Sequence, residues 1–511
     1  MTRRWPFWTF GSGPAVASLF HRLLGLISLA AWWSLGSQVR VLIGSRGLLP
    51  VGAFMDAVRA DGRVSLLDLP TLFWRFHSDG LLVGGTVLGV ALAIAALLGF
   101  RPRLCFALST VLYLSYATVS RDFLSFQWDN LLLECGLLAV FLPRDRPAPL
   151  VHFLFRLVLF KLYFESGIAK WQSDLGDWQD GSAMTCYYET APLPTFLAFT
   201  AHHLPVWWHH LESRATLVLE LLVPLLIFGP RRARLGAAFA FWFFQIVNAA
   251  TANYGFFCYL AAVLGVFLLD DADVARARAQ ASRVLPAAVR RLFARLDLSR
   301  PAPVATEARR RSSAAWLGRA GAALFVIASL VDGLYAFTEP GRALAAAEPL
   351  YDLNRRFRLV NTYHLFASIT RERIEPQLET LAAGADLSRA DAAGAPWTPH
   401  DFWHKPGDPR RAPGFVAPHQ PRVDFQLWFY GLSFQRREPA YVTTLVERMC
   451  EDPAAVQPLF REPLPPHPAA VRLVFWQYQF TSRAERRATG AWWRRARLAM
   501  SRAIPCASVR P

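Results

Sequence analysis

Long apolar runs, separated by short turns that contain arginine, fill most of residues 1–337. A helix needs about 20 apolar residues to cross the hydrocarbon core of a bilayer. Backbone groups in lipid must be hydrogen-bonded within the protein, and a helix does this within its own segment. The runs therefore predict an α-helical multi-span membrane bundle of about 8–9 spans. We place the candidate spans at 23–43, 81–100, 104–119, 121–142, 150–169, 216–228, 235–250, 256–269 and 315–337.

The composition agrees with this class. Hydrophobic residues make up 53% of the chain and its mean hydropathy is +0.23, whereas a soluble domain is usually about 45–50% apolar. The formal net charge is +17. Its arginines lie largely between apolar runs, where they act first as a signal of membrane orientation. We therefore expect a lipid bilayer as a partner and no nucleic acid.

The same arginines predict the orientation. If the N-terminus lies inside, the turns at 101–103, 144–146 and 231–234 are inner turns, and each contains at least two arginines. The opposite turn 251–254 contains none, although the 40–75 loop is mixed. Short cytoplasmic loops are enriched in Lys and Arg. Nine spans with this orientation place the C-terminal region on the non-cytoplasmic side.

Changes in composition divide the chain. Residues 1–269 form the predicted transmembrane bundle, 270–314 a basic cytoplasmic linker and 315–337 the last transmembrane helix. Residues 350–482 are rich in proline, charge and aromatic side chains, and they contain no run long enough to span a bilayer. Residues 483–511 form a basic tail, for which we expect an interfacial helix or disorder.

Local patterns predict the fold of the C-terminal region. Residues 471–480 are rich in β-branched and aromatic side chains, which is typical of a strand. Phe425, Trp428 and Phe429 have helical spacing, and 441–449 broadly does too. We expect a C-terminal extramembrane α+β domain. In the linker, residues 285–296 place four aliphatic side chains on one helical face, which suits either a helix on the inner leaflet or a solvated linker.

The run at 121–142 contains three polar residues on one helical face. Gln127, Asn130 and Glu134 are spaced i, i+3 and i+7. Lipid cannot satisfy such a stripe, so it must face the protein interior or a wet cavity. The stripe is interpreted either as a helix–helix packing seam or as part of a ligand or catalytic pocket.

The run at 150–169 contains charges as well. Lys161 and Glu165 are spaced i, i+4 and can neutralise each other, while Arg156 needs another partner. Glu134 and Glu220, on other spans, are candidates. Charges inside a span are costly and are usually paired or functional. We expect Glu165 to pair with Lys161 or Arg156, in an interhelical ion-pair network or along a path for protons or substrate.

The histidines and cysteines do not form a recognisable site. His202, His203, His209 and His210 follow one another in a loop whose geometry no helical pattern fixes, and prolines flank the pair His400 and His404. The sequence lacks G-x-S-x-G, H-E-x-x-H, a phosphate-binding loop and G-x-G-x-x-G. We therefore predict no catalytic residue, cofactor or metal. On the predicted outer side Cys186, Cys450 and Cys506 allow three alternative disulfides.

Several motifs, in this order and spacing, resemble the lipase maturation factor family. In the bundle these motifs are FLSFQWD at 123–129, YETAPLP at 188–194, ELLVP at 220–224, FGPRR at 228–232 and NYGFF at 253–257. In the C-terminal region they are VNTY at 360–363, KPGD at 405–408 and APHQPR at 417–422. The resemblance covers most of residues 120–480. The chain departs from the family pattern at Ala191 and His364, where the family usually has glutamine and glycine.

The resemblance implies a multi-span membrane chaperone of the endoplasmic reticulum that assists the folding and assembly of secreted lipases through a luminal C-terminal domain. In a bacterium, which the alanine- and arginine-rich composition favours, the same protein would lie in the cytoplasmic membrane. We expect the aromatic-rich surface around Phe425, Trp428, Phe429 and Trp476 to contact the client. The bundle also resembles, more distantly, the vitamin K-dependent carboxylase-like transmembrane family. That likeness makes an intramembrane enzyme the alternative.

Overall fold

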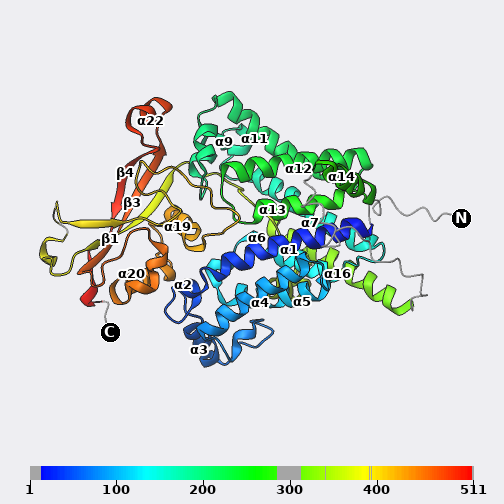
Figure 1. Cartoon of the computed structure of the whole chain (residues 1–511), viewed down its shortest axis with the longest axis horizontal. Coiled ribbons are helices and arrows are strands. Elements are labelled where there is room, and N and C mark those ends of the chain that lie inside the picture. Colours follow the sequence, from blue (N-terminus) through cyan, green and yellow to red (C-terminus); the bar gives the residue numbers. More distant parts are fainter. Residues whose placement is uncertain (1–12, 285–311, 340, 391, 393, 509–511) are drawn as a thin grey trace.

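The computed structural model describes residues 13–284, 312–339, 341–390, 392 and 394–508. Most helices gather in one part of the molecule, and the sheet, with a few helices beside it, lies at one end of the long axis (Figure 1). The segment 285–311, with most of the basic linker and its predicted leaflet helix, lies outside the described residues.

The predicted apolar runs are helical, in whole or in part, wherever the structure describes them. The helices that contain them are α1 (Pro14–Gly36), α4 (Asp79–Leu97), α5 (Pro102–Val119), α6 (Gln127–Val140), α7 (Pro149–Trp171), α11 (Val206–Leu221), α12 (Arg231–Thr251), α13 (Phe257–Leu264) and α16 (Ser312–Phe337). Proline occupies the first turn of α1, α5 and α7, where its missing N–H costs nothing.

Four helices in the described part of the chain are long and apolar enough to cross a membrane: Pro14–Gly36, Asp79–Leu97, Arg231–Thr251 and, within α16, Trp316–Phe337. Apolar helices of this length indicate a membrane protein. Helix α7 has 23 residues but contains Arg156, Lys161, Glu165 and Lys170. The count of eight or nine crossings stays a prediction.

The first helix does not occupy the range predicted for it. It covers Pro14–Gly36 rather than 23–43, and residues 39–43 form a separate short helix, α2 (Val39–Ile43). Asp271 explains the early start, because its carboxylate accepts hydrogen bonds from the backbone N–H groups of Ala15 and Val16, at 3.2 and 3.0 Å. A side chain 255 residues away thus caps this helix, and no local pattern reveals it.

Shorter helices complete the first 284 residues. They are α3 (Val51–Asp61), α8 (Asp177–Asp180), α9 (Ala183–Thr190), α10 (Phe196–His202) and α14 (Asp271–Val284), with 3₁₀ turns at Leu72–Trp74, Arg121–Leu124, Val223–Phe228 and Gly265–Leu268.

The C-terminal region is an α+β domain, as predicted. Its antiparallel sheet has the strand order β2-β1-β3-β4, and β5 pairs with β3 beyond this path. The strands are β1 (Arg373–Leu381), β2 (Trp397–His400), β3 (Ala470–Phe480), β4 (Trp493–Met500) and β5 (Ile504–Pro505). The helices are α17 (Arg342–Ala345), α18 (Glu348–Phe357), α19 (Arg422–Ser433), α20 (Ala440–Glu451), α21 (Pro453–Val456) and α22 (Arg483–Thr489), with 3₁₀ turns at Leu387–Arg389, Gln457–Leu459 and Cys506–Ser508.

The basic tail is part of this sheet. Strand β4 pairs with β3 from Phe480↔Trp493 to Val474↔Met500. The predicted boundary at 482 therefore falls between two paired strands, and residues 493–500 form a strand rather than an interfacial helix or a disordered segment. Only Trp493 of β4 is buried and most of its other residues are exposed, so the strand lacks the alternation of apolar and polar side chains that identifies a strand in sequence. Cys506 then closes a disulfide with Cys450 of α20, one of the three alternatives.

Candidate functional site at the contact between bundle and C-terminal domain

The polar stripe of α6 faces a segment of the C-terminal region. We call residues 358–369, between α18 and β1, the docking segment. Gln127 accepts a hydrogen bond from the backbone N–H of His364 (3.0 Å), and Asn130 accepts one from the guanidinium of Arg358 (3.1 Å). Glu134 accepts one from the backbone N–H of Asn361 (3.2 Å). Gln127 belongs to the motif at 123–129 and Asn361 to the motif at 360–363. These two family-like motifs therefore meet at one contact.

Glu134 is the centre of this contact. Its fully buried carboxylate accepts from the hydroxyl of Tyr363 (2.6 Å) and pairs with Lys161 Nζ (3.3 Å). Lys161 also lies 3.5 Å from the hydroxyl of Ser329 on α16. A carboxylate buried in this way is stable only with such partners.

The structure corrects the predicted pairing of Glu165. Lys161 forms its ion pair with Glu134 rather than with Glu165, and Glu165 accepts from the backbone N–H of Tyr363 (2.9 Å). Lysine before glutamate at i, i+4 is the poorer orientation on one helix, so a carboxylate on another helix competes well. Arg156 reaches neither predicted glutamate; it donates to the carbonyl of Phe267 (2.8 Å).

A second buried ion pair also contacts the docking segment. Lys170 of α7 pairs with Glu220 of α11 (2.8 Å) and donates to the carbonyl of Leu365 (2.7 Å). The sequence makes Glu220 a candidate partner of Arg156, but in the structure Glu220 pairs with Lys170. The docking segment therefore contacts charged side chains of α6 and α7 directly, and through Lys170 it is linked to α11.

A third ion pair joins α6 to the first turn of α19. Asp129 and Arg422 are both fully buried, and the guanidinium binds the carboxylate with two hydrogen bonds of 2.5 and 2.8 Å. The hydroxyl of Tyr113 donates to the same carboxylate (2.6 Å). Bidentate geometry is the strongest form of this interaction. Both residues end family-like motifs, but neither is among the site residues predicted from sequence.

The family-like segments at 188–194 and 405–408 also approach each other. Arg373, at the start of β1, donates to the carbonyls of Glu189 (3.0 Å) and Pro192 (2.8 Å). It also pairs with Glu375 (2.6 Å), which binds Lys405 as well. Burial lowers the pKa of Lys405, and the Glu375 carboxylate opposes this effect. No local sequence pattern reveals this cluster, because Arg373 lies more than 180 residues from the carbonyls that it binds.

The four aromatic residues proposed for client contact have different surroundings. Phe425 is buried against Phe126 and Trp128 of the bundle, and the indole N–H of Trp428 donates to the carbonyl of Thr190 (2.8 Å). Phe429, in contrast, is 44% exposed. The side chain of Trp476 is half-buried, with the guanidinium of Arg495 stacked 4.2 Å from its ring centre. Phe425 and Trp428 are therefore core residues of the contact between the two parts and cannot form an exposed surface.

The four histidines of the predicted loop lie on α10, on α11 and in the turn between these helices. Within the described residues, no three or more His, Cys, Asp or Glu side chains are close enough to hold a metal ion. Instead His209 lies within hydrogen-bond distance of Glu212 (3.2 Å), and this contact raises the pKa of His209. Burial lowers the pKa of His202 to about 4, helped by the charges of His203 and His209.

The C-terminal domain has a polar groove of about 400 Å³. Trp403 and Phe415 are its exposed aromatic residues, at 43% and 55%. Arg411 and Arg461 also line it; Arg411 pairs with Asp401 (3.0 Å), and Arg461 lies 5.0 Å over the ring of Trp403. Exposed aromatic side chains beside arginine are typical of protein-binding surfaces.

Comparison with known proteins covers both parts. The family described as lipase maturation factor transmembrane domain matches residues 15–276, and the family described as lipase maturation factor C-terminal domain matches residues 359–503. The second match begins at the docking segment and ends after β4, so it includes the strand that the predicted boundary had excluded.

Comparison of the chain with individual relatives agrees with these two family matches. The chain is 30% identical to Lipase maturation factor 2 of Homo sapiens over 587 residues, covering 93% of this chain and 80% of the relative. It is 31% identical to Lipase maturation factor 1 of Bos taurus over 503 residues, covering 93% and 86%. No solved structure matches the chain.

Proposed function

This chain belongs to the lipase maturation factor family, and on that premise we propose that it is a membrane-embedded factor that assists the folding and assembly of secreted lipases. The observation that carries the proposal is the match of both parts of the chain, over almost its whole length. The buried contact between the α6 stripe and the docking segment supports a common action of the two parts, because it holds the C-terminal domain on the bundle.

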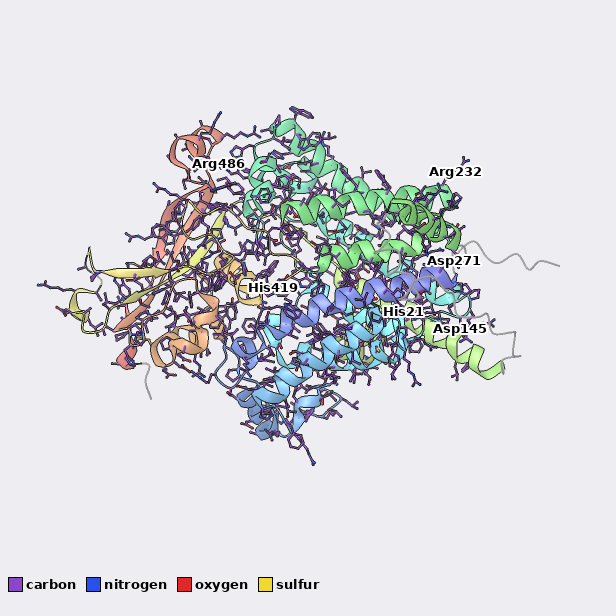
Figure 2. All side chains as sticks on the ribbon, in the orientation of Figure 1. His21, Asp145, Arg232, Asp271, His419 and Arg486 are labelled. Carbon is purple, nitrogen blue, oxygen red and sulfur yellow. A yellow bond between two sulfur atoms is a disulfide. The ribbon has the colours of Figure 1, made fainter. Side chains whose placement is uncertain are left out.

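The C-terminal domain faces the non-cytoplasmic side in this proposal. Figure 2 places Arg232, Asp271 and Asp145 at the end of the molecule opposite the sheet, so the arginine-rich turns lie far from that domain. The Cys450–Cys506 disulfide within the domain fits an oxidising compartment. That compartment is the endoplasmic reticulum lumen, or the periplasm for a chain from a bacterial cytoplasmic membrane.

The client binds the polar groove of the C-terminal domain through Trp403 and Phe415. A maturation factor must bind the unfinished client in preference to the finished one, and exposed apolar side chains of a folding intermediate provide that difference. Aromatic side chains contribute strongly to such contacts. Phe429 remains a secondary candidate, since it is exposed on α19.

The proposal is tested by co-expressing a secreted lipase with this chain in cells that lack a maturation factor. The readout is lipase activity per amount of lipase antigen, so that folding is separated from synthesis. Trp403→Ser with Phe415→Ser should lower this ratio several-fold. Leu387→Ser with Leu498→Ser is the matched control, because both leucines are exposed on the same domain, at 42% and 45%, but lie outside the groove.

Two outcomes contradict different parts of the proposal. If the parent chain leaves the activity ratio unchanged, the maturation role is wrong for that lipase. If the parent chain raises the ratio and the groove variant raises it equally, the role stands and the client binds elsewhere. Truncation after Phe337 is a poorer test, because it removes the partners of Glu134 along with the domain.

A further inference from the structure

Helix α16 is joined to its neighbours by polar contacts in its second half. Ser329 lies 3.5 Å from Lys161 Nζ, and Asp332 accepts a hydrogen bond from Asn354 of α18 (3.0 Å). Tyr335 stacks on Tyr351 at 4.3 Å. The first half of α16 borders an apolar groove of about 650 Å³, which α16, α6 and α7 line together with residues of α18 and the docking segment. Figure 1 draws this first half at the end of the molecule opposite the sheet.

The walls of this groove are suited to a hydrocarbon chain. Leu138 of α6, Leu154 of α7 and Phe325 of α16 line it. Gly318 and Gly321 of α16 line it too, and a Cβ added at either glycine would meet no atom within 4 Å. Protein interiors are close-packed, and a gap without partner atoms forfeits dispersion contacts. Inside a bilayer, the acyl chain of a lipid is available to fill such a groove.

One end of the groove is positively charged. Arg103 and Arg146 line it, and both belong to turns that the arginine pattern assigns to the inner side. Arg103 donates from Nε to the carbonyl of Val140 (2.5 Å), which leaves its other N–H groups for a ligand. Arg146 has no hydrogen bond or ion pair with any described residue. Asp145 precedes it but does not line the groove, so both lining charges are positive.

We propose that this groove binds an anionic glycerophospholipid of the inner leaflet. One acyl chain lies along Gly318 and Gly321, and the phosphate binds Arg103 and Arg146. Basic pockets between membrane helices on the cytoplasmic side select anionic headgroups. The lipid joins the first half of α16 to α6 and α7, where protein contacts leave a gap. This inference goes beyond lipase maturation and depends only on the proposed orientation.

The first experiment measures headgroup selectivity. The full chain is reconstituted with phosphatidylglycerol or with phosphatidylcholine of the same acyl chains, and bound lipid is counted by native mass spectrometry. The parent should retain phosphatidylglycerol in preference by roughly tenfold, from two arginines at the membrane surface. Arg103→Gln with Arg146→Gln should abolish the preference. Arg101→Gln with Arg232→Gln removes two inner-side arginines outside the groove and should preserve it.

The second experiment tests the acyl-chain position. Gly321→Leu fills the groove without changing charge, and it should reduce retention of both lipids. Folding of each variant is checked by monodisperse elution and by the intact Cys450–Cys506 disulfide. Gly321→p-benzoylphenylalanine should crosslink to lipid on irradiation. Crosslinking to a peptide of this chain, undiminished lipid retention in a folded Gly321→Leu variant, or a preference that survives loss of both arginines would overturn the proposal.

Discussion

Tyr363 and Glu134 lie 229 residues apart in sequence, and the tyrosine hydroxyl donates a 2.6 Å hydrogen bond to the buried carboxylate. The bond links the docking segment of the C-terminal region to the polar stripe of α6. Glu134 also pairs with Lys161 of α7, so this one carboxylate links α6, α7 and the docking segment. Any change at Glu134 should therefore weaken the attachment of the C-terminal domain as well as the packing of the bundle.

Glu134→Gln should destabilise the protein more than Tyr363→Phe. The first leaves Lys161 as a buried charge without its counter-ion, which typically costs about 3–5 kcal/mol. The second removes one hydrogen bond to a charged group, worth about 1.5–3 kcal/mol. Thermal unfolding in detergent measures both. Equal unfolding temperatures for the parent and Glu134→Gln would show that this carboxylate does not hold the structure together.

Asp129→Asn should loosen the C-terminal domain far more than Arg46→Gln. Both substitutions break an ion pair that joins the two parts of the chain, but Asp129 and Arg422 are fully buried, whereas Arg46 is 62% exposed in its pair with Asp452. Breaking a buried pair typically costs about 3–5 kcal/mol, whereas solvent screens the attraction within an exposed pair, so that its loss has little effect on stability. Limited proteolysis between the two parts provides the readout. Similar cleavage rates for the two variants would contradict the assignment of Asp129–Arg422 as the stronger attachment.

Cys450→Ser with Cys506→Ser should destabilise the C-terminal domain. The disulfide closes a separation of 56 residues, for which the chain-entropy model gives about 4 kcal/mol. Cys186→Ser should have little effect on stability, because that thiol is free and only half-buried. Mass mapping of the non-reduced protein checks the pairing. A peptide that joins Cys186 to either of the other two cysteines would contradict it.

Acidification should destabilise the folded protein. Burial lowers the pKa of His202 and of His419 to about 4, while an unfolded histidine has a pKa of about 6.5. Below pH 6.5 these histidines become protonated in the unfolded state but stay neutral in the folded state. Their contribution to the free energy of unfolding is therefore fully present above pH 6.5 and is lost as the pH falls toward 4. At pH 5 the loss is on the order of 2 kcal/mol for each histidine.

The measurement is the unfolding temperature at pH 7.5 and at pH 5.0. His202→Gln and His419→Gln should each reduce the difference between the two values, whatever they do to stability at pH 7.5. His467→Gln is the control. A pH difference that persists unchanged in the double variant His202→Gln with His419→Gln would assign the acid sensitivity to other groups.

Much of this protein follows from local sequence pattern. The period of the apolar runs predicts helices wherever the structure describes them, and the residue types at 471–480 predict β3. The spacing of Gln127, Asn130 and Glu134 predicts a polar face turned toward protein. These features depend on neighbours within a few residues, so the sequence alone determines them.

Tertiary structure decides what that polar face binds. Its partner is the docking segment more than 220 residues away, and the ion pair of Lys161 goes to another helix instead of along its own. Three further features also depend on contacts between distant segments: the cap of α1 by Asp271, the strand β4 in the basic tail and the burial of Phe425. Each depends on which distant segments meet, because a buried charge or an edge strand is stabilised by whichever partner the fold brings within hydrogen-bond reach. No local period in the sequence contains that information.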